Sequence, residues 1–218
     1  MKIKLFIFIL LSFNYFLVFS QNNERLPQSL DLNNFKQEKQ HILKTNPFAL
    51  LISQNPLTAE FRVLYERTNG LKQSYNIGAS YLYANFITRY FFNEFKDTTG
   101  IDLVVNGFRV QAGYKFYLSK DQYSPTGIYV SPHASYSLAK INPRGFINDY
   151  LKVYYINANL LLGWQFFFLD KIAVDLFTGL GYRYNYIMSK DRFSTSEDFE
   201  LLNNGVKFSL GINFGYPF

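Results

Sequence analysis

The segment Gly205-Val-Lys-Phe-Ser-Leu-Gly-Ile-Asn-Phe-Gly-Tyr-Pro-Phe218 decides the fold of this chain. Its even-numbered positions, from Val206 to Phe218, are all large and apolar or aromatic, whereas its odd-numbered positions are nearly all small or polar. Because successive side chains of a β-strand point to opposite faces, the segment is predicted to be a strand with one apolar and one polar face. A soluble β-sandwich could contain one such strand, so the fold depends on whether the pattern repeats.

The same alternation recurs along the chain. It occupies six earlier segments: Thr58–Arg67, Gln73–Tyr83, Gly107–Leu118, Gly127–Leu138, Leu151–Phe168 and Ile172–Tyr184. Residues 42–53 alternate less clearly and contain Pro47, so they are predicted to be half strand and half turn, and a full first strand there stays open. With this segment counted as a strand, the chain has eight predicted strands. Bacterial outer-membrane β-barrels have an even number of strands.

The connections between these segments alternate in length. Short turns are predicted at Asn69-Gly70, a strong hairpin signal, and at 119–126 and 169–171. Longer loops are predicted at 85–103, 139–150 and 185–204. Short turns on one side and longer loops on the other are typical of outer-membrane barrels. The sequence therefore predicts an all-β fold, an eight-stranded antiparallel up-and-down transmembrane β-barrel.

The two faces of the predicted strands differ in charge. A Lys or Arg facing lipid at the bilayer midplane costs about 2–4 kcal/mol, so a membrane barrel keeps its charges inside. The charged side chains on the polar face are predicted to form a lumen network: Glu60, Arg62, Glu66, Arg109, Lys115, Asp175 and Arg183. Arg67 and Lys152 fall on the apolar face, but at strand ends, where the cost is about 0–1 kcal/mol. Glycines on the polar face, including Gly163 and Gly211, suit a crowded barrel interior.

The N-terminal residues predict export. Lys2 and Lys4 precede an apolar run that ends in small Ser20, which indicates a cleavable signal peptide over residues 1–20. A periplasmic N-terminal arm is predicted over 21–40 and the barrel over 41–218. Loss of the two lysines lowers the formal net charge from +6 to +4, which does not support nucleic-acid binding. The chain has no Cys, which excludes disulfides, thiolate metal ligands and a lipid-modified N-terminal cysteine.

The strand sequences resemble those of small Gram-negative outer-membrane barrels. The resemblance is carried by Phe61-Arg-Val-Leu-Tyr-Glu-Arg67, Ile77-Gly-Ala-Ser-Tyr81, Arg109-Val-Gln-Ala-Gly-Tyr-Lys-Phe-Tyr117, Gly127-Ile-Tyr-Val-Ser-Pro132, Leu162-Gly-Trp-Gln165, Val174-Asp-Leu176 and Gly215-Tyr-Pro-Phe218. The chain is similar to a domain-of-unknown-function group in the OmpA/OmpX-like superfamily of eight-stranded barrels, and the resemblance covers about residues 42–218. The resemblance implies a location in the cell outer membrane and no known activity. It also implies that barrel-assembly machinery recognises the last strand through Phe214, Tyr216 and Phe218.

Three functions are weighed for such a barrel. The first is a non-enzymatic, monomeric outer-membrane protein with a structural or loop-mediated role, a lumen filled by side chains, and lipid and lipopolysaccharide as surroundings. The second is a lipid A-modifying hydrolase, because His133 and Ser135 share a strand face and have the His-x-Ser spacing of outer-membrane deacylases. The third is a narrow pore lined by charges. No cofactor or metal site is predicted, since His41 and His133 are the only histidines and do not cluster with other ligands.

Overall fold

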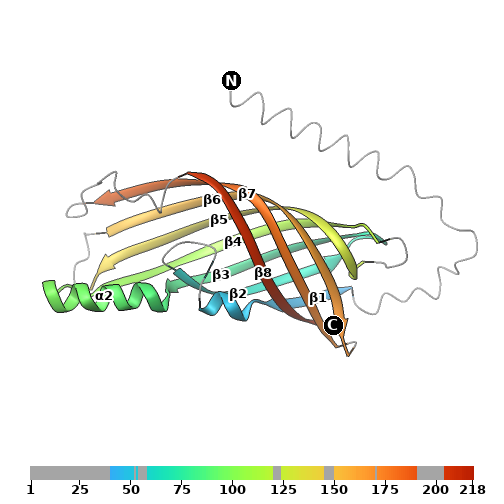
Figure 1. Cartoon of the computed structure of the whole chain (residues 1–218), viewed down its shortest axis with the longest axis horizontal. Helices are drawn as coiled ribbons and strands as arrows, with labels where there is room; N and C mark the ends of the chain where they lie inside the picture. The colour runs from blue at the N-terminus through green and yellow to red at the C-terminus, as the bar shows by residue number, and fades with distance from the viewer. Residues whose placement is uncertain are drawn as a thin grey trace, which may run out of the picture. The chain divides into compact units, whose positions relative to one another are not determined.

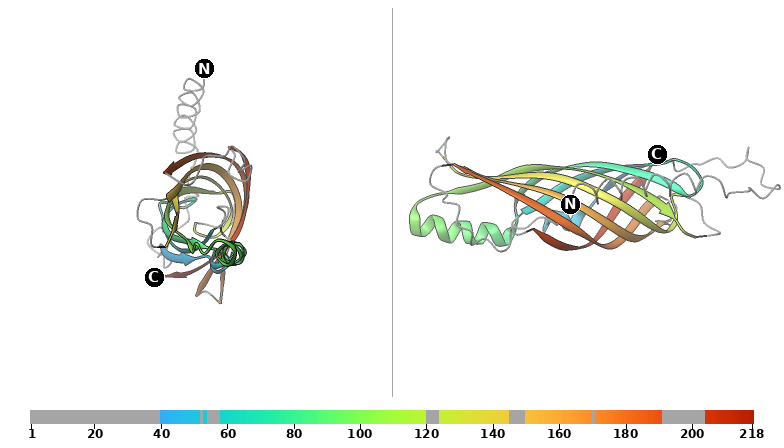
Figure 2. Two further views of the ribbon diagram at one scale, coloured as in Figure 1. Left: turned by 90° about the vertical axis from the view of Figure 1, so that its left-hand side faces the viewer. Right: turned by 90° about the horizontal axis from the view of Figure 1, so that it is seen from above.

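The computed structural model describes residues 40–51, 53, 58–119, 124–144, 150–169, 171–190 and 204–218, with the side chains of residues 189 and 190 left out. Eight strands form one closed barrel in sequence order, and each neighbouring pair is antiparallel (Figures 1 and 2). The prediction of an all-β, eight-stranded antiparallel up-and-down barrel is therefore confirmed. The predicted signal peptide and, apart from residue 40, the N-terminal arm lie outside the described residues.

The strands lengthen from β1 to β7. Their bounds are His41–Thr45 for β1, Thr58–Thr68 for β2, Gln73–Ala84 for β3, Leu103–Tyr117 for β4, Gly127–Pro143 for β5, Tyr150–Phe168 for β6, Ile172–Lys190 for β7 and Gly205–Pro217 for β8. One end of the barrel carries the β2–β3, β4–β5 and β6–β7 connections and the last residue of the chain, and we call it the short-turn end. The other end carries the remaining connections and is called the long-connection end.

The first strand is the shortest part of the wall. β1 pairs with β2 from His41 to Lys44 and with β8 from Ile42 to Thr45. A 3₁₀ turn, η1 (Pro47–Leu50), follows at once and contacts both β2 and β8. Asn46 caps this turn, because its side chain accepts a 3.1 Å hydrogen bond from the Ala49 N–H, and Pro47 needs no donor at the first helical position. The prediction of half strand and half turn over 42–53 is confirmed for the described residues.

One predicted loop is wrong. Residues 85–103 contain a 14-residue helix, α2 (Phe86–Thr99), at the long-connection end (Figure 1). The Asn85 side chain caps its first turn by accepting a 2.8 Å hydrogen bond from the Thr88 N–H. Gly100 ends it in the left-handed conformation, with φ of 73°, and donates its N–H to the Lys96 carbonyl. These local caps make a helix where the lack of strand alternation indicated only a loop.

Two other predicted loops are shorter than expected. β5 and β6 extend the wall to the pair Ile141↔Leu151, and β7 continues through Asn185 to Lys190, which pairs with Tyr150. The predicted loops at 139–150 and 185–204 therefore begin with strand residues. The polar side chains that suggested loops lie close to the barrel end, where a strand need not have an apolar outer face. The centre of the 185–204 loop lies outside the described residues.

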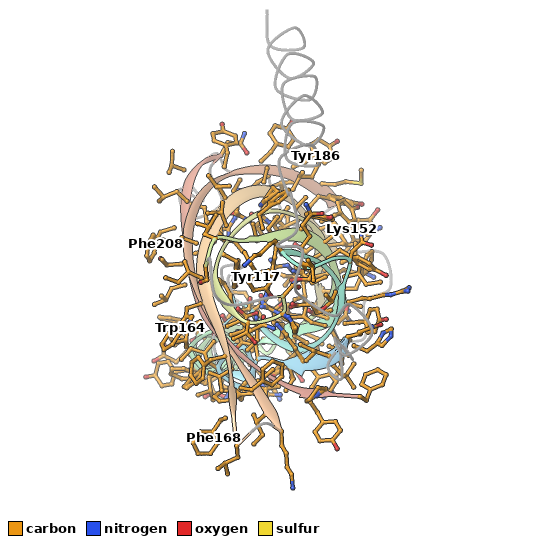
Figure 3. All side chains as sticks on the ribbon, turned by 90° about the vertical axis from the view of Figure 1, so that its right-hand side faces the viewer. Tyr117, Lys152, Trp164, Phe168, Tyr186 and Phe208 are labelled. Atoms are coloured by element: carbon orange, nitrogen blue, oxygen red, sulfur yellow. The ribbon has the colours of Figure 1, made fainter. Side chains whose placement is uncertain are left out.

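The barrel sorts its side chains by polarity. Figure 3 shows Tyr117 inside the ring of strands, with Trp164, Phe168, Tyr186 and Phe208 outside it. Nine charged side chains on the strands point inward and are at most 9% exposed: Lys44, Glu60, Arg62, Glu66, Arg109, Lys115, Asp175, Arg183 and Lys207. Outward-facing Phe61, Ile77, Leu160 and Phe208 are between 51% and 64% exposed. In the described strands, the outward-facing charged residues are Arg67, Lys140 and Lys152, all near strand ends.

Candidate functional site

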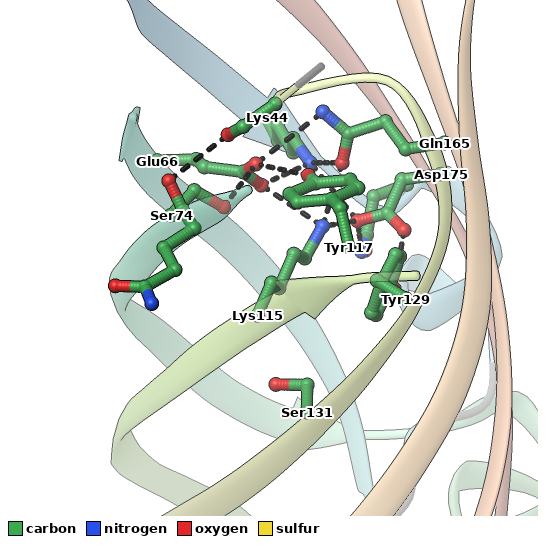
Figure 4. A network of polar contacts seen from close by, with 12 residues as sticks. Lys44, Glu66, Ser74, Lys115, Tyr117, Tyr129, Ser131, Gln165 and Asp175 are labelled. Atoms are coloured by element: carbon green, nitrogen blue, oxygen red, sulfur yellow. Dashed lines mark hydrogen bonds and ion pairs between the residues drawn. The ribbon is translucent and has the colours of Figure 1, made fainter. Parts of the chain in front are cut away.

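The lumen near the short-turn end holds a compact group of charges, which we call the lysine cluster: Lys44, Glu66, Lys115, Gln165 and Asp175 (Figure 4). The five residues come from β1, β2, β4, β6 and β7, so each reaches the same point from a different part of the wall. None is more than 3% exposed. Two ammonium groups and two carboxylates meet there, and their formal charges cancel.

Each ammonium group in the lysine cluster uses all three of its donors. Lys44 Nζ lies 2.6 Å from Glu66 Oε2, 2.7 Å from Gln165 Oε1 and 2.9 Å from Asp175 Oδ2. Lys115 Nζ lies 2.9 Å, 2.6 Å and 2.9 Å from the same three oxygens. A lysine ammonium has three N–H donors and no acceptor, so both groups are saturated. Buried ion pairs offset their desolvation only with such geometry.

The remaining carboxylate oxygens of the lysine cluster also have donors. Glu66 Oε1 accepts hydrogen bonds from Ser74 at 2.9 Å, Tyr117 at 3.0 Å and Gln165 at 3.3 Å. Asp175 Oδ1 accepts one from the Tyr129 hydroxyl at 2.5 Å. The Lys115 ammonium lies 4.2 Å from the centre of the Tyr129 ring, an additional cation–π contact. The lysine cluster is thus a closed, hydrogen-bonded plug of the lumen.

A second polar group lies nearer the long-connection end, and we call it the arginine cluster: Glu60, Arg62, Arg109, Ser135, Asn157 and Arg183. Glu60 Oε1 pairs with both Arg62 and Arg109. From Arg109 the hydrogen bonds run to Ser135 Oγ at 3.1 Å, which also accepts from Asn157 at 3.2 Å. Arg183 Nε donates to Asn157 Oδ1 at 3.0 Å. Two guanidinium groups therefore share the Glu60 carboxylate, and the third, that of Arg183, joins the cluster through Asn157.

A cavity is lined by residues of both clusters. About 40 Å³ of it is open to the centres of water molecules, and its wall includes Arg62, Arg109, Gln111, His133, Asn159 and Ser209. Lys44, Glu66, Lys115 and Asp175 line it as well. A water molecule needs about 10–15 Å³ by this measure, so the cavity holds a few waters or one small ion. It is too small for a metabolite or a lipid.

His133 and Ser135 lie inside the barrel and have other partners. His133 Nδ1 is 3.4 Å from Asn159 Nδ2. Ser135 Oγ accepts from Arg109 and from Asn157. A Ser nucleophile needs a base within hydrogen-bond reach of its hydroxyl, and among the described contacts His133 does not supply one. In the described part of the chain, no group of three or more His, Asp or Glu side chains is placed to hold a metal ion.

The structure brings together all seven residues of the predicted lumen network, in two clusters. Glu66, Lys115 and Asp175 join the lysine cluster, and Glu60, Arg62, Arg109 and Arg183 the arginine cluster. Sequence reasoning missed Lys44, because Pro47 obscured the face of the short β1 strand. It also missed the roles of Tyr117 and Gln165, although Tyr117 has the same parity as Lys115 and could have been found by counting. Phe214, Tyr216 and Phe218 point outward, with Phe218 stacked on His41 at 5.9 Å.

The outer face has a row of aromatic rings toward the long-connection end. Phe108, Tyr136, Tyr154 and Tyr186 contact one another in sequence across β4 to β7, with ring centres 5.9–6.4 Å apart. Toward the short-turn end, Trp164 packs on Phe166 and Tyr114 on Phe116. Between these aromatic groups the large outward-facing residues of β4 and β6 are aliphatic, among them Val110, Ile156 and Leu160, whereas β7 and β8 also expose Tyr182, Tyr184 and Phe208.

Comparisons of the chain with protein-family models, with curated proteins and with solved structures gave no match. Among the residues that the structure describes, no helix combines the length and the apolar character needed to cross a membrane.

Proposed function

We propose that this protein is an integral outer-membrane β-barrel of the OmpA/OmpX-like kind, exported by a cleavable signal peptide. Its role in this proposal is structural, or is exercised through its outer loops, and it performs no chemistry of its own. The lumen is filled by its own side chains, in keeping with an eight-stranded barrel, whose interior is only wide enough for side chains. Lipid and lipopolysaccharide surround it, and barrel-assembly machinery recognises its last strand.

The observation that carries the proposal is the outer face. Large apolar side chains such as Leu160, Leu180 and Phe208 are 59–64% exposed around a closed barrel that buries nine charged side chains in its lumen. An exposed apolar surface of this extent marks a contact with membrane or protein. In water these side chains would favour the inside of the barrel, and the charges the outside.

The spacing of the aromatic groups supports a bilayer as the contact. Ten positions separate Tyr154 from Trp164 on β6. At about 3.3 Å per residue they span about 33 Å along the strand, which is about 25 Å along an axis tilted by about 40°. The apolar band of outer-membrane barrels is about 25 Å tall and lies between two aromatic girdles.

The outward-facing charges agree with this placement. Lys140 and Lys152 lie directly opposite each other beyond the Tyr136–Tyr154–Tyr186 row, and both ammonium groups stand over the Tyr150 ring, at 5.4 Å and 4.7 Å. Near the headgroups such a charge costs little, and two adjacent lysines favour phosphate-bearing lipid. Arg67 lies at the opposite end, one residue from the end of β2.

One substitution separates a membrane barrel from a water-soluble one. We expect Leu160→Arg, in the middle of β6, to lower the stability of the folded protein in bilayers by about 2–4 kcal/mol, because it places a charge in hydrocarbon. Phe168→Arg, at the end of the same strand, is the matched control and should cost about 0–1 kcal/mol. Folding is measured by the difference in gel migration between unboiled and boiled samples after titration with urea in lipid vesicles.

The opposite result would reject the membrane assignment. If the mature chain is monomeric and folded in buffer without detergent, and Leu160→Arg leaves its stability unchanged, the outer face contacts water. The hydrolase alternative is tested by mass spectrometry of lipid A from cells with and without the protein, where we expect an unchanged acyl pattern. The pore alternative is tested by planar-bilayer recordings, where we expect no channel activity.

A further inference from the structure

We propose that the lumen cavity binds one small monovalent inorganic anion, of the size of chloride, against Arg62 and Arg109. The proposal concerns the interior of the barrel and stands whether the outer face contacts lipid or water. It rests on three observations: the balance of formal charge around the cavity, a buried guanidinium N–H without a hydrogen-bond partner among the described residues, and the volume of the space.

The formal charges of the described residues around the cavity do not cancel. The two ammonium groups and two carboxylates of the lysine cluster neutralise one another. Arg62 and Arg109 also line the cavity and share one carboxylate, Glu60, which is not part of the cavity wall. These three residues are at most 3% exposed and carry a formal charge of +1. A net buried charge is unfavourable, and one bound monovalent anion would neutralise it.

The cavity wall offers donors suited to an anion. Arg62 Nε has no hydrogen-bond partner in the described part of the structure, although its side chain is buried in this wall. The Ser209 hydroxyl is also buried there without a partner among the described residues. A guanidinium N–H and a hydroxyl are both donors that an anion can use. Three acceptors of the wall also lack a partner among the described residues, and water in the rest of the cavity would satisfy them: Gln111 Oε1, Asn159 Oδ1 and Asn213 Oδ1.

The size of the space selects the ligand class. About 40 Å³ open to water centres accommodates an ion only slightly larger than water together with one or two waters. Organic acids and phosphorylated metabolites are too large. The arginine cluster continues toward the long-connection end with a third guanidinium, Arg183, so the surrounding charge is of the sign that attracts an anion.

The experiment compares the full mature chain refolded in sodium chloride and in sodium gluconate at equal ionic strength. Both salts screen charge equally, but gluconate is too large for the cavity. We expect the melting temperature to rise by several degrees with chloride concentration and to stay nearly constant in gluconate. Arg62→Met leaves Arg109 and Glu60 as a neutral pair, so this variant should lose the chloride dependence. Arg67→Met, on the outer face, is the control and should keep it.

A direct measurement keeps the proposal testable if Arg62→Met does not fold. Crystals of the unsubstituted protein grown with bromide in place of chloride should show an anomalous peak within hydrogen-bond distance of Arg62 and Arg109. A cavity that holds only water would show no peak, and the protein would melt identically in the two salts. Either of these two results overturns the proposal.

Discussion

The two polar clusters of the lumen use the same kinds of residue but differ in completeness. In the lysine cluster, two carboxylates receive both ammonium groups, and their other oxygens take donors from Ser74, Tyr117 and Tyr129. In the arginine cluster, one oxygen of Glu60 receives two guanidinium groups, while its second oxygen has no partner among the described residues. The first cluster is neutral and saturated. The second has more guanidinium groups than carboxylates, and its Glu60 Oε2 and Arg62 Nε lack a partner among the described residues.

This difference separates a structural role from a binding role. A saturated network of buried charges fixes the strands that contribute to it, since every displacement breaks several hydrogen bonds at once. An unsaturated network beside a cavity can accept a ligand, because its free donors gain a partner without losing another. The lysine cluster therefore acts as the rigid plug of the barrel. The arginine cluster is the part of the lumen where the proposed anion would bind.

The largest effect is expected from removing a carboxylate of the lysine cluster. Asp175→Asn leaves Lys44 and Lys115 with Glu66 as the only carboxylate in that cluster, and breaking a buried ion pair in this way costs about 3–5 kcal/mol. The measurement is the free energy of unfolding in urea for the refolded protein. Asp102→Asn is the control: its partners Lys96 and Arg144 are exposed, and the loss should be at most about 1 kcal/mol.

A second substitution separates charge from packing in that result. Asp175→Asn combined with Lys115→Met restores neutrality to the lysine cluster, so the double variant should recover part of the stability that Asp175→Asn loses. If the losses in unfolding free energy from Asp175→Asn and from Lys115→Met simply add in the double variant, packing and not charge balance stabilises the lysine cluster. The two clusters would then not differ in charge balance as described above.

A smaller effect is expected in the arginine cluster. Glu60→Gln removes its carboxylate, but the loss should be about 1–3 kcal/mol, because an anion or water in the adjoining cavity can face the arginines. The measurement is the urea unfolding of this variant in chloride and in gluconate. The loss should be greater in gluconate, since the cluster then lacks both carboxylate and anion. A loss as large as that of Asp175→Asn in both salts would make the two clusters equivalent.

The barrel itself was predictable from the sequence because its cause is local and repeated. The alternation of apolar and polar residues in each long strand identifies the side chains that face the lumen. Glu60, Arg62 and Asp175 could therefore be placed inside before their neighbours were known. The polar-face glycines follow the same parity. A Cβ on Gly163 would lie 2.3 Å from the Tyr129 ring, and one on Gly211 would lie 2.4 Å from the Phe177 ring, so only glycine fits beside these inward rings.

The parts that were missed depend on causes that alternation does not contain. The helix α2 is produced by Asn85 and Gly100, two capping residues that also occur in ordinary loops. The partition of the lumen into two clusters depends on the register between strands. That register brings Lys44 of β1 within reach of Asp175 of β7, 131 residues away in the chain. No spacing within a single strand encodes such a contact.

The smallest effect, that of Tyr117→Phe, is measured against Tyr129→Phe inside the lysine cluster itself. Tyr129 is the donor to Asp175 Oδ1 at 2.5 Å, whereas Tyr117 shares Glu66 Oε1 with Ser74 and Gln165. Hydrogen bonds to charged groups contribute about 1.5–3 kcal/mol, so Tyr129→Phe should cost an amount in that range. Tyr117→Phe should cost less, about 0.5–1.5 kcal/mol, because two donors remain on the same oxygen.

Both tyrosine variants keep the aromatic ring, so the difference in their urea unfolding free energies reports the hydroxyl alone. Equal losses would mean that Glu66 gains as much from its third donor as Asp175 Oδ1 gains from its one described donor. In that case saturation would not distinguish one carboxylate from another. It could then not explain why the lysine cluster is closed by its own hydrogen bonds while Glu60 Oε2 and Arg62 Nε of the arginine cluster have no partner among the described residues.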